Sequence, residues 1–378
     1  MQKKTEYDIA LIGGGLAGLA TSILLAKASR SVVLFEKEKY PFHKVCGEYL
    51  SLESWNFLTQ LGLPLSQMSL PMIDTLLLTA PNGNVFKTKL PLGGFGISRY
   101  YLDSALAKLA EQSGVQVLEE TKIDDVAYSD NCHTIGASNK LLSTVCCAAY
   151  GKRSNLDIKW KRKFLKTSKS PLDNYVGIKY HVKTNWEENV IGLHNFDNGY
   201  CGISKIEGDK YCLCYMTNAE NLKKSGNNIA QLEETFLYKN PHLKKIFLNS
   251  EKVESFPITI SQINFNKKTQ VENHVLMLGD SAGMITPLCG NGMSIALHTA
   301  KIAAMLIQLF LNQEISRTKM EALYKKEWKR QFASRLKMGR ILQHFFGNNR
   351  LSNLFVGAFR TFPSLSGPVI KMTHGKPF

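Results

Sequence analysis

The 378-residue sequence predicts an α/β fold with an inserted antiparallel β-sheet and a helical C-terminal tail. The first observation is a β-α-β unit near the N-terminus, in which apolar strands at 8–12 and 32–35 flank a helix. The second is a run of short strand patterns at 175–217, typical of antiparallel pairing. The third is a buried strand at 275–278. A chain of this length is expected to form one large domain or two interlocked ones.

The remaining elements follow from apolar periodicity and from glycine or Asn-Gly breaks. Gly62 and Gly114 mark helix ends, and Asn82-Gly83 marks the turn of a hairpin. In chain order we expect a helix at 52–62, a hairpin at 73–97, a helix at 100–113, a strand at 115–118, short strands within 122–150, helices at about 229–248, a long helix at about 291–311 and a helical tail at 318–378.

The formal net charge of +16 is concentrated in two segments. Residues 312–378 hold 13 Lys/Arg against 3 Asp/Glu, and residues 151–170 hold 8 against 1. These segments indicate either an anionic partner, such as a lipid surface or an acidic carrier protein, or simply a solvated face. No stacking-aromatic, zinc-finger or helix-turn-helix pattern is present, so we expect no nucleic-acid partner.

The eight cysteines form no C-x-x-C pair, which is typical of reduced thiols in the cytoplasm. Because cysteine and histidine are scattered, we predict no metal site. Acidic residues and Gly13-Gly14-Gly15 interrupt the N-terminal apolar run, which argues against a signal peptide. The apolar segment Ile302 to Leu311 is judged too short to span a bilayer. We therefore expect a cytoplasmic protein, or one peripheral to the inner membrane.

The first chemical motif is Gly13-x-Gly15-x-x-Gly18, between the first strand and its helix. Its glycines allow a tight turn, the approach of a pyrophosphate and close helix packing, while the helix N-terminus offers free N–H donors. Glu36 ends the second strand, where a carboxylate can bind ribose hydroxyls but would repel a 2′-phosphate. The motif therefore predicts a dinucleotide, either FAD or NAD.

The second motif, Gly279-Asp280-Ser281, follows the strand at 275–278 and continues through Pro287-Leu288-Cys289-Gly290-Asn291-Gly292-Met293 into a helix. It resembles the second FAD fingerprint of the large superfamily of flavoprotein monooxygenases and reductases. The resemblance implies that Asp280 binds the ribityl chain and that the glycine turn backs the flavin ring. A helix N-terminus there would stabilise the negative charge of a reduced flavin. The cofactor is therefore expected to be FAD, in a Rossmann-like domain of three layers.

Two further stretches resemble geranylgeranyl reductase-like flavoproteins and aromatic monooxygenases of the p-hydroxybenzoate hydroxylase type. Ile97 to Asp103 implies Arg99 beside the cofactor, and Pro41 to Ser51 implies a flavin-side loop with Lys44 and Cys46. The Cys46 thiol is a candidate proton donor, or a packed small side chain. The implied cofactor set is Gly13, Gly15, Ala17, Gly18, Glu36, Lys37, Lys44, Arg99, Asp280, Gly290, Gly292 and Met293.

The sequence also departs from these relatives. Tyr150 replaces the aspartate of their Ala-Asp-Gly-x-x-Ser motif, which puts the use of NAD(P)H in doubt. Residues 200–205 lack the Tyr-x-Trp-x-Phe-Pro box of geranylgeranyl reductases. No Trp-x-Trp-x-Ile-Pro box is present, so halogenase chemistry is disfavoured.

These motifs divide the chain into three parts. We assign 1–72, 97–165 and 270–320 to a discontinuous FAD-binding domain, 73–96 and 166–269 to a substrate-binding domain, and 321–378 to a C-terminal helical segment. In that segment, aromatic and apolar residues alternate with arginines, which suits a membrane interface, a channel for a long apolar substrate, or a helix packed on the core. The residues are Phe345, Phe346, Leu351, Leu354, Phe355, Phe359 and Phe362, with Arg340, Arg350 and Arg360.

The leading hypothesis is an FAD-dependent oxidoreductase, a monooxygenase that hydroxylates an aromatic or polyketide-like hydrophobic substrate. NAD(P)H would be its transient reductant, and the substrate would be free or bound to a carrier protein. The first alternative is a reductase of C=C bonds in a prenyl or polyene lipid. The second is a non-enzymatic lipid escort on the same fold, which the intact cofactor motifs disfavour.

Overall fold

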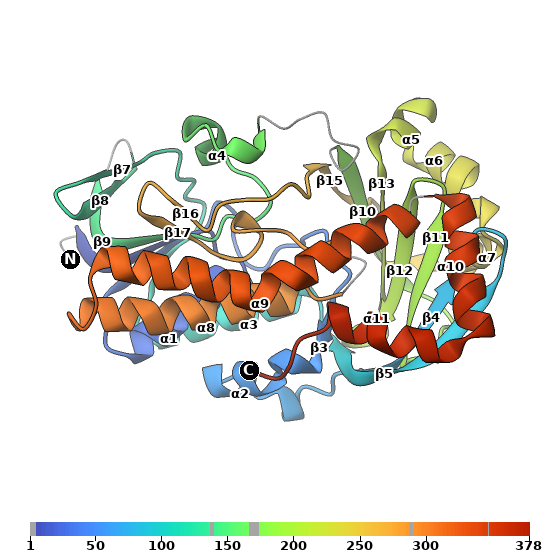
Figure 1. The fold of residues 1–378 in the computed structure, drawn as a ribbon, viewed down its shortest axis with the longest axis horizontal. Helices are drawn as coiled ribbons and strands as arrows, with labels where there is room; N and C mark the ends of the chain where they lie inside the picture. The colour runs from blue at the N-terminus through green and yellow to red at the C-terminus, as the bar shows by residue number, and fades with distance from the viewer. Residues whose placement is uncertain (1–4, 137–139, 166–173, 287–289, 347) are drawn as a thin grey trace.

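The computed structural model describes residues 5–136, 140–165, 174–286, 290–346 and 348–378. A first sheet has the strand order β16-β17-β9-β1-β2-β6 and is parallel from β17 to β6 (Figure 1). The hairpin β7-β8 pairs with its strand β9. The strands are β1 (Glu6–Ile12), β2 (Val32–Phe35), β6 (Gln116–Leu118), β7 (Val126–Ser129), β8 (Cys132–Ile135), β9 (Leu141–Ala148), β16 (Val271–Glu272) and β17 (Val275–Met277).

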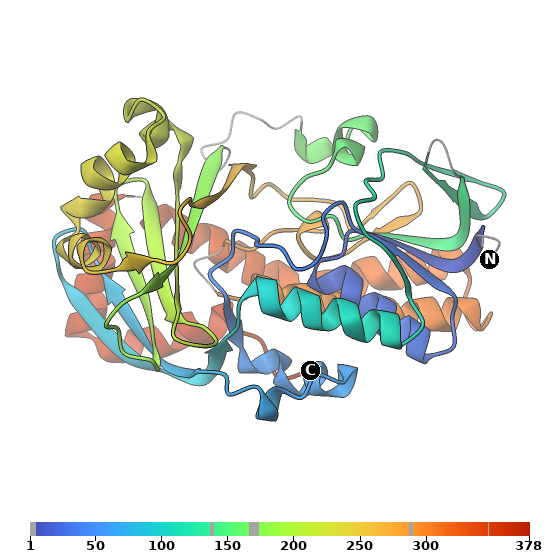
Figure 2. The ribbon, with the colours of Figure 1, turned by 180° about the vertical axis from the view of Figure 1, so that it is seen from behind.

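The central strands of this sheet are continuously apolar because both of their faces are covered. Ile9, Ala10 and Leu11 of β1 are fully buried. Helices α3 (Arg99–Gln112) and α8 (Gly292–Leu311) pack against α1 (Leu16–Lys27), and α9 (Arg317–Phe346) lies along α8 (Figures 1 and 2). The β1-α1-β2 unit therefore sits in the centre of the main core.

A second sheet has the order β14-β10-β13-β12-β11-β4-β5-β3, with β15 also pairing with β10. Its meander β10 to β13 is antiparallel, as predicted, whereas β4 runs parallel to β11. The strands are β3 (Tyr49–Ser51), β4 (Met72–Thr79), β5 (Val85–Gly96), β10 (Tyr175–Lys183), β11 (Val190–Phe196), β12 (Gly199–Lys205), β13 (Tyr211–Asn218), β14 (Glu251–Lys252) and β15 (Ile258–Ile263). The early hairpin and the later meander thus form one sheet.

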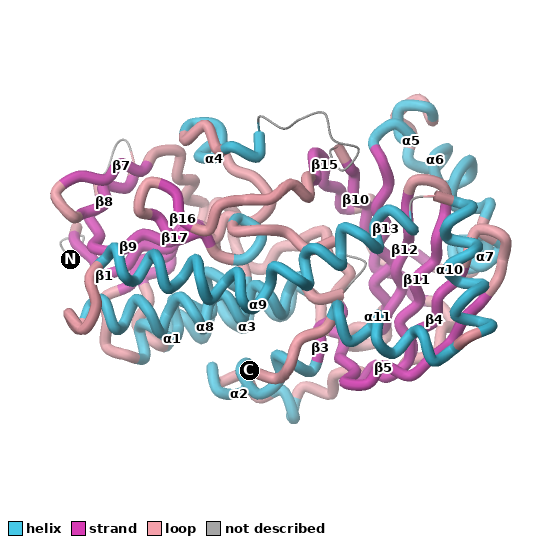
Figure 3. Tube along the Cα trace, viewed as in Figure 1, coloured by secondary structure: helices cyan, strands magenta, loops and turns pink. Residues whose placement is uncertain are grey.

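Helices cover this second sheet from opposite sides, as Figures 1 and 2 show. α6 (Ile229–Phe236) and α7 (Pro241–Leu248) form a separate apolar core with β10 to β13. On the other side, α10 (Asn349–Thr361) contacts β5 and β11, and α11 (Ser366–Thr373) contacts β5 (Figure 3). The shorter helices are α2 (Trp55–Leu61), α4 (Asn155–Lys159) and α5 (Ala219–Lys224).

The predicted α/β class, the inserted sheet and the helical tail are confirmed. One boundary differs: β3, which we assigned to the FAD-binding part, pairs with β5 of the second sheet. The expectation that the apolar segment ending at Leu311 is too short to span a bilayer was wrong on length. Small and polar residues extend its helix to 20 residues, which is long and apolar enough by length and composition to cross a membrane, but 56% of its most apolar 18-residue window is buried inside the fold.

Candidate functional site

The first glycine motif forms the turn from β1 into α1. Gly13 has φ +107°, and a Cβ on Gly18 would lie 2.0 Å from the Gly13 carbonyl oxygen, so both positions require glycine. Gly15 is the N-cap of α1, where no side chain caps the helix and the first turn holds no acidic residue. The free N–H groups and the helix dipole therefore leave this N-terminus ready to bind a phosphate.

The side chains of Arg99 and Lys44 lie close to Gly15. A Cβ built on Gly15 would lie 3.6 Å from Arg99 Nη2 and 3.8 Å from Lys44 Nζ. Asp103 holds both, because Arg99 donates two hydrogen bonds of 2.7 Å to its carboxylate and Lys44 donates one of 3.0 Å. Burial alone would raise the pKa of Asp103, but the charges of Arg99 and Lys44 keep it below its ordinary value. The Gly15 turn and these two cations together present the positive charge that suits a pyrophosphate.

Glu36 is fixed at the end of β2. The backbone N–H of Gly14 donates to Glu36 Oε2 at 2.9 Å, and that of Glu38 donates to Oε1 at 3.1 Å. The carboxylate therefore lies beside the glycine turn, as predicted. Lys37 does not, because its side chain is 65% exposed and pairs with Glu38 at 3.4 Å.

The second glycine motif touches the first. Gly279 has φ +57°, and a Cβ there would lie 3.3 Å from the Cβ of Ala17 in α1. The Ser281 hydroxyl hydrogen bonds the carbonyl oxygen of Ala148, 2.5 Å away, and so ties the motif to β9. Asp280 lies between these anchors. Segments more than 250 residues apart thus meet, as one extended cofactor requires.

The N-terminus of α8 follows the second glycine motif in the chain. Gly290 has φ +64°, no side chain caps the helix at Asn291, and its first turn holds no acidic residue. Pro287, Leu288 and Cys289 of the predicted turn lie outside the described residues. The positive end of the α8 dipole is therefore free to act on a ligand.

One cavity connects both motifs with the second sheet. Seven of the twelve predicted cofactor residues line it, namely Gly15, Ala17, Arg99, Asp280, Gly290, Gly292 and Met293. Of the other five, Gly13 and Gly18 shape the turn, Glu36 and Lys44 lie beside that turn, and Lys37 is exposed. The lining comprises Gly15, Leu16, Ala17, Val45, Cys46, Gly47, Glu48, Tyr49, Arg99, Ala149, Gly151, Lys152, Gly177, Ile191, Leu193, Tyr200, Gly202, Ile203, Ser204, Cys214, Tyr215, Met216, Ile263, Leu278, Gly279, Asp280, Met284, Ile285, Gly290, Gly292, Met293 and Ala296.

The loop that carries Cys46 is tethered to β10 by a buried ionic cluster. Glu48, which follows Gly47, has a fully buried carboxylate. Lys179 donates to its Oε1 at 2.6 Å, the backbone N–H of Arg99 donates to the same atom at 2.9 Å, and His181 Nε2 lies 2.7 Å from Oε2. Cys46 therefore reaches the cavity wall from a loop held against the second sheet.

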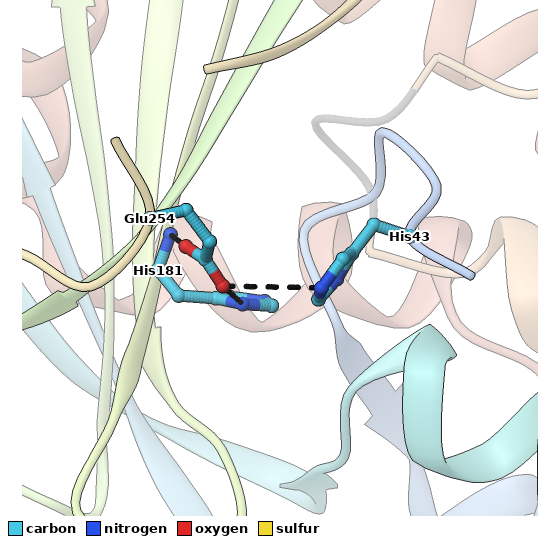
Figure 4. A group of neighbouring side chains, drawn as sticks. All are labelled: His43, His181 and Glu254. Carbon is cyan, nitrogen blue, oxygen red and sulfur yellow. Dashed lines mark hydrogen bonds and ion pairs between the residues drawn. The ribbon is translucent and has the colours of Figure 1, made fainter. Parts of the chain in front are cut away.

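The cluster extends outward from His181 to Glu254 and His43, as Figure 4 shows. His181 Nδ1 lies 2.9 Å from Glu254 Oε1, and His43 Nε2 lies 3.9 Å from that oxygen. Burial would raise the pKa of Glu48 and of Glu254, but hydrogen bonds with His181 bring both below their ordinary values. The polar atoms of His43, His181 and Glu254 lie within 4.8 Å of one another, yet carboxylates already engage both His181 nitrogens. Hydrogen bonding therefore accounts for this trio.

Sequence reasoning missed this cluster and a second group of hydrogen-bonded side chains, formed by Tyr150, Asp157 and Arg162. Tyr150, which replaces the relatives' aspartate, donates to Asp157 Oδ1 at 2.6 Å. Arg162 bonds the same carboxylate at 2.8 Å and the Ser281 carbonyl oxygen at 3.0 Å, so it supports the second motif. Glu48 lies more than 130 residues from Lys179 and His181, and Arg162 lies 119 residues from Ser281, so these contacts form no local motif. The one available signal was that Lys179 and His181 alternate on one face of an otherwise apolar strand.

A second, narrower cavity continues from the first. The two cavities share Tyr49, Ile191, Leu193 and Gly290 as lining residues. The C-terminal helices close the narrow cavity with Phe346, Phe355, Phe359, Val369 and Ile370, and Leu76, Leu78, Leu90, Leu342, Thr373 and His374 complete its wall. Its lining is almost entirely apolar, which suits a long hydrocarbon chain.

Comparisons with known proteins agree with this geometry. Residues 11–45 match the family model of an NAD(P)-binding Rossmann-like domain, and residues 204–341 match that of squalene epoxidase. The chain is 23% identical to conditioned medium factor receptor 1 of Dictyostelium discoideum, over 90% of this chain and 70% of that protein. It is also 23% identical to a digeranylgeranylglycerophospholipid reductase of Methanosarcina acetivorans, over 91% and 86% of the two chains.

Solved structures share the fold over nearly the whole chain. The flavin-dependent brominase Bmp2 superposes with a TM-score of 0.78 at 20% identity, covering 98% of this chain and 93% of that chain. The flavin-dependent halogenase CmlS gives the same TM-score at 19% identity, covering 100% and 74%. Both comparisons show that this chain shares its overall fold with these structures.

Proposed function

Because this chain belongs to the superfamily of FAD-dependent flavoproteins, we propose that it is a monooxygenase that hydroxylates an aromatic group carrying a long apolar chain. The observation that carries the proposal is the wall shared by the cofactor cavity and the narrow apolar cavity. An aromatic head in the first and its hydrocarbon tail in the second would fill both. The tail would supply the binding free energy that positions the head.

The residues present fit FAD along its whole length. Glu36 would accept hydrogen bonds from the ribose, and the N-terminus of α1 with Arg99 and Lys44 would hold the pyrophosphate. Asp280 would bind the ribityl chain, and the N-terminus of α8 would face the ring near Gly292 and Met293. This positive helix end would stabilise negative charge on the ring.

The proposed reaction consumes one O₂ and one NAD(P)H for each hydroxyl group formed. Substrate C–H, O₂, NAD(P)H and a proton give C–OH, water and NAD(P)⁺, so two electrons come from the nicotinamide and two from the C–H bond. FAD, when bound, supplies the redox chemistry, while the chain positions the substrate and excludes water. The match of residues 204–341 to the squalene epoxidase model supports an oxygen-inserting reaction.

The alternative is reduction of C=C bonds in an isoprenoid chain. The position of Cys46 in the cavity wall favours it, since a thiol there can donate the proton that follows hydride transfer. The likeness to a digeranylgeranylglycerophospholipid reductase supports it as well. In this reaction C=C, NAD(P)H and a proton give CH–CH and NAD(P)⁺, with no oxygen consumed.

Oxygen uptake separates the two reactions. The FAD-loaded protein would be given NADH or NADPH together with 4-alkylphenols of increasing chain length or, separately, with a polyprenyl lipid, in air and without oxygen. A hydroxylase shows substrate-stimulated O₂ uptake that increases with chain length. Full turnover without oxygen would contradict the hydroxylase, and a colourless protein that cannot be loaded with FAD would favour a lipid escort over both enzymes.

Replacing Cys46 with alanine gives a second discrimination. In a hydroxylase the thiol is a packed wall residue, so we expect the rate of substrate oxidation to fall by less than about threefold. In a C=C reductase it donates a proton, so the rate is expected to fall by about 100-fold or more. Steady-state rates of wild type and variant, both loaded with FAD, measure the difference.

Replacing Leu193 with tryptophan should shorten the usable tail. Leu193 lines both cavities, so a larger side chain would close the passage between them. We expect kcat/KM for long-chain phenols to fall by about tenfold while that for short ones stays within about twofold. An equal loss for all chain lengths would contradict the assignment of the narrow cavity to the tail.

A further inference from the structure

We propose that the exposed faces of α10 and α11 dock this protein on an anionic phospholipid bilayer. The docking surface is defined by apolar residues and flanking cations, namely Leu351, Leu354, Phe362, Leu365 and Met372 with Arg350, Arg360 and Lys371. Through this surface the narrow cavity would receive its long-chain substrate from the bilayer. Only that last step rests on the proposed function; the docking itself does not.

Helix α10 carries two apolar faces. Val356 and Phe359 are buried against the fold, whereas Leu351 and Leu354 are 38% and 70% exposed. Leu351, Leu354 and Ala358 recur at spacings of three and four, so they share one side of the helix. A helix that only covered the core would need one apolar face, and the second remains without a partner in the described part of the chain.

More exposed apolar side chains follow α10 in the chain. Phe362 is 60% exposed, Leu365 is 51% exposed and Met372 of α11 is 46% exposed. Aromatic and aliphatic side chains exposed on neighbouring helices are typical of an interfacial membrane contact.

The positive charge of this region favours an anionic bilayer as the partner. Residues 348–378, which include both helices, contain four Lys/Arg and no Asp or Glu. A second copy of the chain would present the same cations and be repelled. An acidic carrier protein would pair with the cations but would leave the exposed apolar side chains without an apolar partner. A bilayer with acidic headgroups can pair with the cations and also bury the apolar side chains.

The same two helices face the narrow cavity with their other sides. Phe355 and Phe359 of α10 and Val369 and Ile370 of α11 line it. The cavity and the docking surface are therefore separated by the thickness of one helix layer, so a lipid-soluble substrate leaving the bilayer would have a short apolar route toward Tyr49 and Gly290 at the cofactor cavity.

Co-sedimentation with vesicles tests the docking without any substrate. The FAD-loaded protein should bind vesicles of phosphatidylcholine with phosphatidylglycerol, and bind pure phosphatidylcholine vesicles at least about tenfold more weakly. The double variant Leu354→Asp/Phe362→Asp should lose anionic-vesicle binding by at least about tenfold. Phe256, which is 82% exposed elsewhere, provides the matched control Phe256→Asp, which should bind like wild type.

Retention of the FAD absorption spectrum shows that each variant is folded. Equal binding of wild type to the two vesicle types, or an equal loss in the Phe256→Asp control, would overturn the proposal. The proposal would also be overturned if wild type bound no vesicles and instead formed a dimer that the double variant Leu354→Asp/Phe362→Asp dissociates. Vesicle binding by a protein that shows no substrate-stimulated oxygen uptake would refute the proposed reaction and leave the docking intact.

Discussion

Replacing Gly15 with valine is expected to weaken FAD binding by at least about 100-fold, or roughly 2.7 kcal/mol, without unfolding the protein. Gly15 has φ −83°, which valine adopts, and a Cβ there meets only Arg99 and Lys44 at ordinary contact distances. The side chain would instead occupy the space that a pyrophosphate needs. Fluorescence titration with FAD measures the affinity, and thermal unfolding measures the stability.

Two other glycines provide controls for this result. Gly367→Val has open space around its Cβ and should leave FAD affinity unchanged. Gly18→Val should destabilise the fold itself, because its Cβ would lie 2.0 Å from a backbone oxygen. An unchanged affinity in a folded Gly15→Val variant would contradict the placement of the cofactor at this turn.

Replacing Lys179 with methionine is expected to lower the free energy of unfolding by about 3–5 kcal/mol. The Lys179 amine and the Glu48 carboxylate are both fully buried and 2.6 Å apart, so the variant leaves a buried carboxylate without its main cationic partner. The exposed pair of Lys87 and Glu187 provides the control. Glu187→Gln should cost less than about 1 kcal/mol, because solvent screens that pair. Denaturant unfolding compares the two variants, and equal losses would contradict the role of burial.

The same cluster should make stability fall in acid. Glu48 and Glu254 have pKa values below their ordinary value of 4.5 in the folded state, so folding is favoured while they are ionised. This contribution is fully present above pH 4.5 and is lost as the pH falls through the folded-state pKa values. In Glu48→Gln the free energy of unfolding should fall less between neutral and acid pH than it does in wild type. A wild-type stability that does not change below pH 4.5 would contradict this assignment.

The cofactor site was largely predictable because its residues sit at fixed offsets within local motifs. Gly13, Gly15 and Gly18 are dictated by one turn, and Asp280 by one strand end. The meeting of the two turns could be inferred only from the length of the expected ligand. Sequence position does not tell which way a side chain beyond a strand points, and the Lys37 side chain is exposed and paired with Glu38.

The buried cluster could not be predicted, since it joins residues more than 130 positions apart that belong to no motif. Glu48 and Lys179 become partners only once the Cys46 loop meets β10. The tail was ambiguous for another reason. Its apolar residues divide between the cavity and the exposed face, as Phe359 and Leu354 illustrate, and composition alone does not assign a residue to either side.

The central claim is that two distant glycine turns hold opposite ends of one FAD molecule. Titration of the protein with FAD, ADP and riboflavin tests it most directly, because each half-ligand reaches only one turn. We expect FAD to bind at least about 100-fold more tightly than either half, and both halves to compete with it. If FAD binds no more tightly than ADP, or riboflavin does not compete, the two turns do not share one cofactor.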